Sequence, residues 1–394
     1  MSRKSIAGYG KGDCVIRSAN EPCIVFVANR GYALTSSRAS LIKHFIDSGW
    51  SVVIATSEDK ESLALVDAGV RIERVLFNRG GASVAADVIA YRRLLKIYSE
   101  WQPCVVHHFN AKPVILGSLA ARRALGSSVV VLNTITGLGH AFVRGGFVAR
   151  LAGAGYGLAL PRADATIFQN RDDRALFLKR GWLSESNCRL VVGSGVDMGR
   201  FVLPMPQPAA NRLTVIMLGR LIWQKGVHEF ASVARSMCQR YPQVRFVWAG
   251  EIDPGHPDAV PQSWLDEQTA FEYVGRVSDV PDRLQNAYLM LFPSYREGVP
   301  RAVMEAAASG VPVVAFDVPG VREAVRHEET GLLVPDRGVD ALTEAVERLL
   351  ADKPLRERMG AAARRLAEAE FDIRSIQAQH LALYRELGVD IAAE

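Results

Sequence analysis

Two glutamates eight positions apart, Glu297 and Glu305, stand where an apolar run gives way to a helix. Glu297 lies in the loop after the run that ends at Phe292, and Glu305 lies one turn into the helix that begins near Pro300. In a doubly wound domain, this loop faces the ligand crevice at the carboxyl end of the sheet. A carboxylate there can accept hydrogen bonds from paired sugar or ribose hydroxyls, and the free amides at the helix start favour phosphates. The alternative for an isolated pair is two solvated charges.

A pair of cations follows a second strand end. Arg220 and Lys225 lie between Gly219, which ends an apolar run, and Gly226. Together they can hold a diphosphate and stabilise the charge that develops on it as it leaves. For either cation alone, a surface charge at a strand end is the simpler explanation. No Asp-x-Asp stands anywhere in the chain, so nothing in the sequence requires a divalent cation, and we expect neither a metal nor a cofactor.

The hydrophobic pattern predicts the elements that position these side chains. Short apolar runs alternate with longer helix-like segments, which is typical of parallel sheets built from strand-helix-strand units. Helices are expected at 37–47, 82–101, 113–125, 147–160 and 171–180, and then at 226–240, 279–286, 300–309 and 340–352. The expected strands are 23–28, 51–56, 70–75, 104–108, 129–133, 165–168 and 189–192, followed by 213–218, 244–249, 271–274, 287–292, 311–315 and 331–334.

The chain divides into two such domains. A length of 394 residues favours two domains at about 150 residues each. The pattern restarts after a segment with three prolines, so the predicted fold is α/β, with two Rossmann-like doubly wound domains facing each other across a cleft. The expected divisions are a basic leader at 1–20, a first domain at 21–201, a linker at 202–211, a second domain at 212–370, and a segment at 371–394 that suits a helix crossing back to the first domain.

Charge is unevenly distributed between the two halves. Residues 1–190 hold 25 basic against 14 acidic residues, whereas residues 191–394 hold 22 against 28. The positive charge of the first half therefore favours binding to an anionic partner, such as lipid head groups or a phosphorylated substrate. Its charges are dispersed and it lacks a recognised binding motif, so we expect no nucleic acid. Five scattered cysteines without a CxxC disfavour zinc or a disulfide framework and fit a reducing, cytoplasmic setting.

The segments named above together resemble family 4 retaining glycosyltransferases of the GT-B fold. Thr330 to Val334 and Gly195-Val196-Asp197 complete the resemblance, in matching order over most of the chain. It implies that the second domain binds a nucleotide-activated sugar and the first domain binds the acceptor. It also implies retention of anomeric configuration. The implied donor contacts are Arg220 and Lys225 with the diphosphate, Glu305 with the ribose, Glu297 with the transferred sugar, and Gly219, Gly298, Val299 and Gly195 around them.

The first domain resembles a bacterial subgroup that extends polyprenyl-diphosphate-linked sugars in O-antigen, capsule or glycan assembly. The resemblance lies in Val106 to Pro113 and Asn133 to Phe142. Many members have a histidine immediately before the glycine of the second loop, where this chain has Thr136. His108 or His140 can be offered as a substitute for this histidine. The alternative is that each of them only forms hydrogen bonds with the backbone. The acceptor-site candidates are Gly31, Arg38, His108, Lys112, Thr136 and His140.

A basic and apolar stretch at 137–162 suits contact with an anionic membrane surface and a lipid acceptor, and core packing is the alternative. No apolar run reaches the 18 or so residues of a membrane span. The expected location is therefore cytoplasmic, peripheral at the inner face of the cytoplasmic membrane. Asp253, His256 and Asp258 have the types of metal ligands, but the glycine and prolines among them favour an exposed turn, and Asp253→Ala is expected to do little.

The sequence thus predicts an enzyme that moves a sugar from a nucleotide diphosphate sugar, expected to be UDP-linked, to a polyprenyl-diphosphate-linked saccharide. One alternative is a GT-B-shaped sugar-nucleotide epimerase, which would use a similar cleft without an acceptor. Another is a non-catalytic nucleotide-sugar or lipid-glycan binding partner. A dehydrogenase is a weaker alternative, because the chain has no GxGxxG that follows a predicted strand and is itself followed by an acidic residue about twenty positions later.

Overall fold

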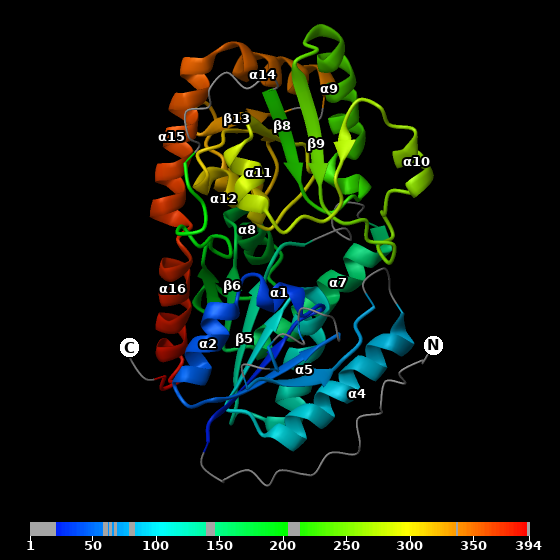
Figure 1. Ribbon diagram of the computed structural model, residues 1–394. Coiled ribbons are helices and arrows are strands. Elements are labelled where there is room, and N and C mark those ends of the chain that lie inside the picture. The colour runs from blue at the N-terminus through cyan, green and yellow to red at the C-terminus, as the bar shows by residue number, and fades with distance from the viewer. Residues whose placement is uncertain are drawn as a thin grey trace, which may run out of the picture.

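A seven-stranded parallel sheet forms the centre of the first domain in the computed structural model (Figure 1). The structure describes residues 21–57, 62, 65–66, 69–78, 83–138, 146–203, 213–335 and 338–391. The strands lie in the order β3-β2-β1-β4-β5-β6-β7. They are β1 (Cys23–Val27), β2 (Ser51–Thr56), β3 (Arg71–Arg74), β4 (Val105–Phe109), β5 (Val130–Ile135), β6 (Ala165–Phe168) and β7 (Cys188–Leu190).

The second domain repeats this topology with a six-stranded parallel sheet in the order β10-β9-β8-β11-β12-β13. In both sheets the strand order reverses beside the first strand, and such a reversal opens a ligand crevice at the carboxyl ends of the strands. The predicted doubly wound α/β fold is therefore confirmed in both domains. The strands are β8 (Leu213–Leu218), β9 (Val244–Ala249), β10 (Glu272–Tyr273), β11 (Leu289–Phe292), β12 (Val313–Phe316) and β13 (Gly331–Val334).

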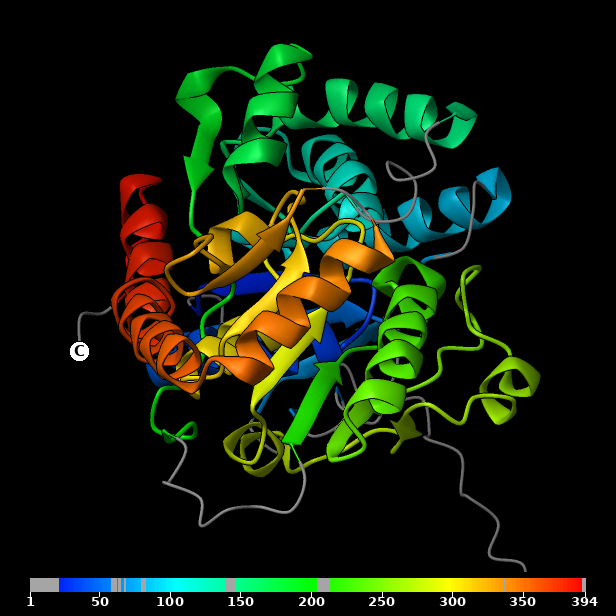
Figure 2. The ribbon, with the colours of Figure 1, turned by 90° about the horizontal axis from the view of Figure 1, so that it is seen from above.

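Helices cover both sheets, because continuous apolar strands such as Cys23–Val27 are buried on both faces. Viewed from above, α9 and α14 lie side by side over the second sheet (Figure 2). The helices are α1 (Tyr32–Thr35), α2 (Ala39–Asp47), α4 (Val84–Trp101), α5 (Ala111–Leu125), α7 (Gly146–Ala159), α8 (Arg171–Lys179), α9 (Val227–Arg240), α10 (Gln262–Asp266), α11 (Val280–Gln285), α12 (Arg301–Ala308), α13 (Val321–Ala324), α14 (Val339–Ala351), α15 (Lys353–Glu370) and α16 (Ile373–Glu386).

The last helix joins the two domains. Helix α15 runs along the second domain and α16 continues along the first (Figure 1). Tyr384 of α16 belongs to the buried apolar cluster of the first sheet, and its hydroxyl lies 2.6 Å from Nδ1 of His107 on β4. Asp372, just before α16, forms a parallel bridge with Val196 after the first sheet. The C-terminal segment therefore packs on the domain that the chain left about 170 residues earlier.

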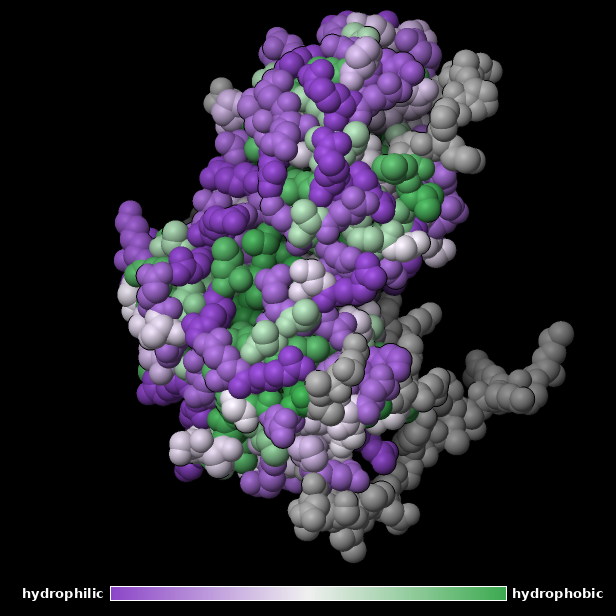
Figure 3. Space-filling model, turned by 90° about the vertical axis from the view of Figure 1, so that its left-hand side faces the viewer, coloured by the Kyte–Doolittle hydropathy of each residue, from purple (hydrophilic) through white to green (hydrophobic). Residues whose placement is uncertain are grey.

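The face that carries α15 and α16 is largely hydrophilic, with hydrophobic residues in scattered patches (Figure 3). Among the residues that the structure describes, no helix is long and apolar enough to cross a membrane. The expected leader at 1–20 lies outside the described residues, as does the expected linker from residue 204 onward.

Candidate functional site

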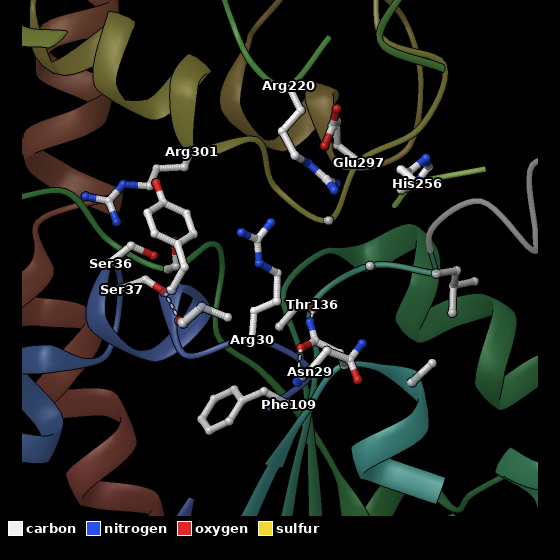
Figure 4. A pocket seen from close by; sticks show the side chains of 18 of the residues that line it. Asn29, Arg30, Ser36, Ser37, Phe109, Thr136, Arg220, His256, Glu297 and Arg301 are labelled. Carbon is white, nitrogen blue, oxygen red and sulfur yellow. Dashed lines mark hydrogen bonds between the residues drawn. The ribbon is translucent and has the colours of Figure 1, made fainter. Parts of the chain in front are cut away.

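A single cleft of about 1840 Å³ lies between the carboxyl ends of the two sheets. Loops after β1, β4 and β5 form its lower wall, and loops after β8, β9 and β11 form its upper wall. Arg220 and Glu297 descend from the upper wall, and Arg30 rises toward them from the lower wall (Figure 4). Both topological switch points thus open into one space, which is where doubly wound sheets bind ligands.

Glu297 is held at the centre of the upper wall. Lys225 forms an ion pair with its Oε1, and each of the two side chains is 14% exposed. The hydroxyl of Ser294 donates to the same oxygen across 2.5 Å. The Lys225 ammonium also lies 5.4 Å from the ring centre of Phe292, at the end of β11. The carboxylate is therefore fixed in one orientation by two donors from its own domain.

Arg220 is paired with a buried carboxylate. Its guanidinium donates to Oδ2 of Asp253 across 2.9 Å, and the Asp253 side chain is 6% exposed. Arg30 of the first domain lies 3.9 Å from the same carboxylate and donates to Glu251 across 3.3 Å. The expectation that Asp253 occupies an exposed turn was therefore wrong. Asp253 points inward because two arginines, one from each domain, neutralise it.

Glu305 lines the cleft from α12, where Arg301 donates to its Oε1 across 2.8 Å. The loop before α12 lies directly against the first domain. A Cβ on Gly298 would lie 2.1 Å from the carbonyl oxygen of Thr136, so only glycine fits there. Asn170 Nδ2 donates to the Gly298 carbonyl across 2.7 Å. The glycine thus brings the donor-side loop directly against the lower wall.

The lower wall contains three of the predicted acceptor residues: Arg38, Lys112 and Thr136. Asn110 donates to the Thr136 hydroxyl across 2.7 Å, and Lys112 pairs with Asp87 at 2.6 Å. Arg38 is almost fully buried, and burial lowers its pKa to about 10. Its Nη1 donates to two backbone carbonyls, whereas its Nε has no hydrogen-bond partner among the described residues.

Comparison with known proteins matches both halves of this architecture. Residues 205–366 match the family model of group 1 glycosyl transferases, and residues 35–192 match the glycosyl transferase 4-like domain. The chain is 26% identical over 376 residues to the N,N'-diacetylbacillosaminyl-diphospho-undecaprenol alpha-1,3-N-acetylgalactosaminyltransferase of Campylobacter jejuni, covering 92% of this chain and 98% of that protein.

The chain belongs to the family 4 glycosyltransferases of the GT-B fold. Solved structures share its fold across nearly the whole chain. Anabaena HepE in complex with UDP and glucose has a TM-score of 0.72 at 17% identity, covering 92% of this chain and 99% of that one. Sucrose-phosphate synthase from Thermosynechococcus elongatus has a TM-score of 0.76 at 20% identity, covering 93% and 99%.

The structure brings together most of the site residues expected for this glycosyltransferase. The predicted donor-side residues that line the cleft are Gly219, Arg220, Lys225, Glu297, Gly298, Val299 and Glu305. Gly195 does not line it. At a φ of +82°, a Cβ on Gly195 would lie 2.7 Å from Cδ1 and 2.9 Å from Cα of Ile373, so this glycine lets the backbone pack closely against the first residue of α16. His140 lies outside the described residues.

Two predicted acceptor residues of the glycosyltransferase do not line the cleft. His108 is buried in the first sheet, where its Nδ1 donates to Asn133 Oδ1 and its Nε2 accepts from the Tyr98 hydroxyl, both across 2.8 Å. Burial lowers its pKa to about 4. Side chains alternate between the faces of a strand, and this position on β4 faces the core. Gly31 precedes α1 with an ordinary helical φ of −59° and is absent from the lining.

Sequence reasoning missed several side chains that hold the cleft residues of the glycosyltransferase in place. Ser294 stands three positions before Glu297, a spacing that could have drawn attention to it. Asp253 was assigned to an exposed turn because its partner Arg220 lies in another loop. Arg301 stands four positions before Glu305 on the same helix, a spacing that could have drawn attention to it. The described residues contain no group of three or more histidine, cysteine, aspartate or glutamate side chains placed to hold a metal ion.

Proposed function

We propose that this glycosyltransferase moves a sugar from a nucleoside diphosphate donor to a saccharide carried on a lipid diphosphate. The observation that carries the proposal is that the cations Arg220 and Lys225 line the same cleft as the largely buried carboxylates Glu297 and Glu305. The similarity to the Campylobacter enzyme, whose name specifies a diphospho-undecaprenol acceptor, extends over 92% of the chain and supports the acceptor class.

The donor would bind along the upper wall. Its diphosphate would lie between Arg220 and Lys225, which would exchange part of their pairing with Asp253 and Glu297 for the phosphate oxygens. The ribose hydroxyls would donate to Glu305, and the sugar hydroxyls would donate to Glu297. Both cations would then stabilise the negative charge that grows on the diphosphate as the bond to the sugar breaks.

The acceptor hydroxyl would approach from the lower wall beside Thr136. Gly298 brings the sugar-binding loop against this residue, which supports an acceptor that would meet the sugar on the face from which the diphosphate departs. Attack on that face would retain the anomeric configuration. The hydroxyl proton would pass to an oxygen of the departing diphosphate, so no side chain of the chain is required as a nucleophile.

A membrane-peripheral location follows from the acceptor class. A lipid diphosphate stays at the bilayer surface, so the lower wall would face the inner leaflet of the cytoplasmic membrane. The excess of basic residues in the first half would strengthen contact with anionic head groups.

The test is transfer of label from a panel of UDP- and GDP-sugars into a bacterial lipid-linked saccharide fraction, with and without chelator. We expect one donor to label the lipid and Glu305→Ala to lose most of that labelling. Glu272→Ala is the matched control, because this glutamate pairs with Arg245 outside the cleft.

Two results would overturn the proposal. Isomerisation of a free nucleotide sugar without lipid labelling would favour an epimerase. Donor binding without turnover, with chelator or with added magnesium, would favour a non-catalytic binding partner.

A further inference from the structure

An apolar groove leaves the cleft on the lower wall and runs over the first domain. Helix α5 packs against both α4 and α7, and all three helices contribute to the lining of one continuous cavity. The groove is therefore a branch of the reaction cleft and not a separate pocket. Its apolar lining includes Val84 and Val88 from α4, Ile115 and Leu119 from α5, and Leu151 and Leu158 from α7.

Helix α7 has apolar residues on two faces. Tyr156 is fully buried against Phe177 and Trp182, and this packing attaches the helix to its domain. Leu151 and Leu158 lie seven positions apart on a different face, and they are 47% and 51% exposed. Core packing therefore accounts for the Tyr156 face of the helix and leaves the leucine face unexplained.

Helix α4 repeats this arrangement on the other side. Val84, Val88 and Tyr91 follow at helical spacing and line the groove, while Leu94 and Tyr98 face the sheet. Val84 is 72% exposed. Contiguous apolar surface of this kind in a soluble domain marks a site for an apolar ligand or partner.

The groove ends at polar side chains where it meets the cleft. Lys112, in the first turn of α5, pairs with Asp87 of α4 at 2.6 Å, and both residues line the cavity. Asn110 and Thr136 follow, next to the loop of Gly298. Along its length, the cavity is thus lined first by apolar side chains, then by the cation Lys112, and then by the residues next to which the reaction would take place. A ligand that matches all three has an apolar chain, an anionic head and a sugar.

We propose that the groove between α4 and α7 holds the isoprenoid chain of the acceptor, with its diphosphate beside Lys112. This rests on the proposed function and names the part of the acceptor that this wall recognises. The enzyme then recognises its acceptor partly through the lipid chain next to the diphosphate, and an acceptor that lacks this chain loses that contribution.

The test compares two acceptors with the same diphosphate-linked saccharide. One bears a long isoprenoid chain in detergent micelles, and the other bears a short, water-soluble alkyl chain. We expect Val88→Glu and Leu151→Glu to raise the KM for the long-chain acceptor about tenfold or more, because each places a charge against the chain. The kcat/KM for the short-chain acceptor should stay the same.

Ile89→Glu is the matched control, because Ile89 is exposed on the same helix, one position from Val88, and lies outside the cavity lining. It should leave both acceptors unaffected. Retained activity on the short-chain acceptor shows that each variant has folded.

Three outcomes would overturn the groove assignment while leaving the transfer reaction intact. In the first, the wild type uses both acceptors with equal kcat/KM. In the second, the groove variants lose as much activity on the short-chain acceptor as on the long-chain acceptor. In the third, the groove variants no longer bind phosphatidylglycerol vesicles but keep their KM for the long-chain acceptor in micelles. The last would assign the groove to the bilayer surface. Failure to use either acceptor would instead contradict the proposed function.

Discussion

Strands β4 and β11 occupy equivalent positions in their two sheets, each beside the first strand of its domain, but they bury different side chains. Strand β11 consists only of apolar residues, Leu-Met-Leu-Phe, whereas β4 places the polar side chains of His107 and His108 in the core. The cleft walls show the opposite contrast. The wall after β11 is charged, and the wall after β4 leads into an apolar groove. The same topology thus supports two different recognition tasks.

The charges of the upper wall are neutralised in pairs. Lys225 pairs with Glu297, and Arg301 pairs with Glu305. Such pairs keep cations partly buried without a ligand, and under the proposed function Lys225 exchanges its partner when a diphosphate arrives. The lower wall needs less charge, because an apolar chain is recognised by the removal of its surface from water. Under the proposed function, this difference means that the donor is recognised by charge and the acceptor largely by shape and burial.

We expect the largest effect from Lys225→Ala, which removes a charge from the upper wall. Loss of the cation that faces the donor diphosphate should lower kcat/KM for the donor about 100-fold to 1,000-fold. The measurement is initial-rate kinetics with varied donor. Arg245→Ala, which breaks a surface ion pair with Glu272, is the control and should retain full activity. Wild-type turnover in Lys225→Ala would remove this lysine from the site.

A smaller loss is expected from Asp253→Asn, which keeps the shape but removes the charge that orients Arg220. We expect kcat to fall about tenfold while the donor KM changes less, because Arg220 loses its fixed position but keeps its charge. Asp266→Asn, on an exposed helix, is the control. An unchanged kcat would show that Asp253 only neutralises the arginine.

The buried histidines should make the first domain sensitive to acid. Burial lowers the pKa of His108 from 6.5 to about 4 and that of His380 to about 3. Between these values and 6.5, the unfolded chain binds more protons than the folded chain. The free energy of unfolding therefore falls as the pH drops below about 6.5, by about 1.4 kcal/mol per pH unit for each histidine.

Urea unfolding at several pH values between about 7.5 and 5 measures this dependence. We expect His108→Gln to have a shallower dependence than the wild type, by about the contribution of one histidine. Identical slopes would mean that His108 is charged in the folded protein.

The smallest expected effect is that of Ser294→Ala. The Ser294 hydroxyl donates one of the two interactions that orient Glu297, and Lys225 remains. We therefore expect about a fivefold loss in kcat/KM for the donor, with the transferred sugar unchanged. A loss as large as that of Lys225→Ala would mean that Ser294 itself contacts the donor.

Local patterns were enough to predict much of the fold and the upper wall. Strands β2, β6, β8, β9 and β13 have the predicted bounds, because each continuous apolar run is followed by a polar, glycine or proline residue. Glu297 and Lys225 follow strands directly, and the carboxyl ends of parallel strands always face the crevice. Their placement in the cleft required no knowledge of distant contacts.

Distant contacts explain what sequence reasoning missed. His108 was expected in the cleft, but the face of β4 that it occupies depends on the sheet register and on Tyr98 of α4. Gly195 was assigned to the donor, although the residue that it must accommodate, Ile373, lies near the other end of the chain. The stretch at 137–162, which contains Leu151 and Leu158, was expected to suit a lipid acceptor. The contribution of α4 and α5 to the groove was not predicted, because its apolar residues come from three helices, each of which also has a core face.

Steady-state transfer over a grid of donor and acceptor concentrations tests the division between the walls most directly. The wild type would be compared with Lys225→Ala and Leu151→Glu, using the long-chain acceptor. The account predicts that Lys225→Ala impairs the donor parameters and leaves the acceptor KM nearly unchanged, and that Leu151→Glu raises the acceptor KM with little effect on the donor. If both variants changed the same parameter, the two walls would not have separate tasks and the account would be wrong.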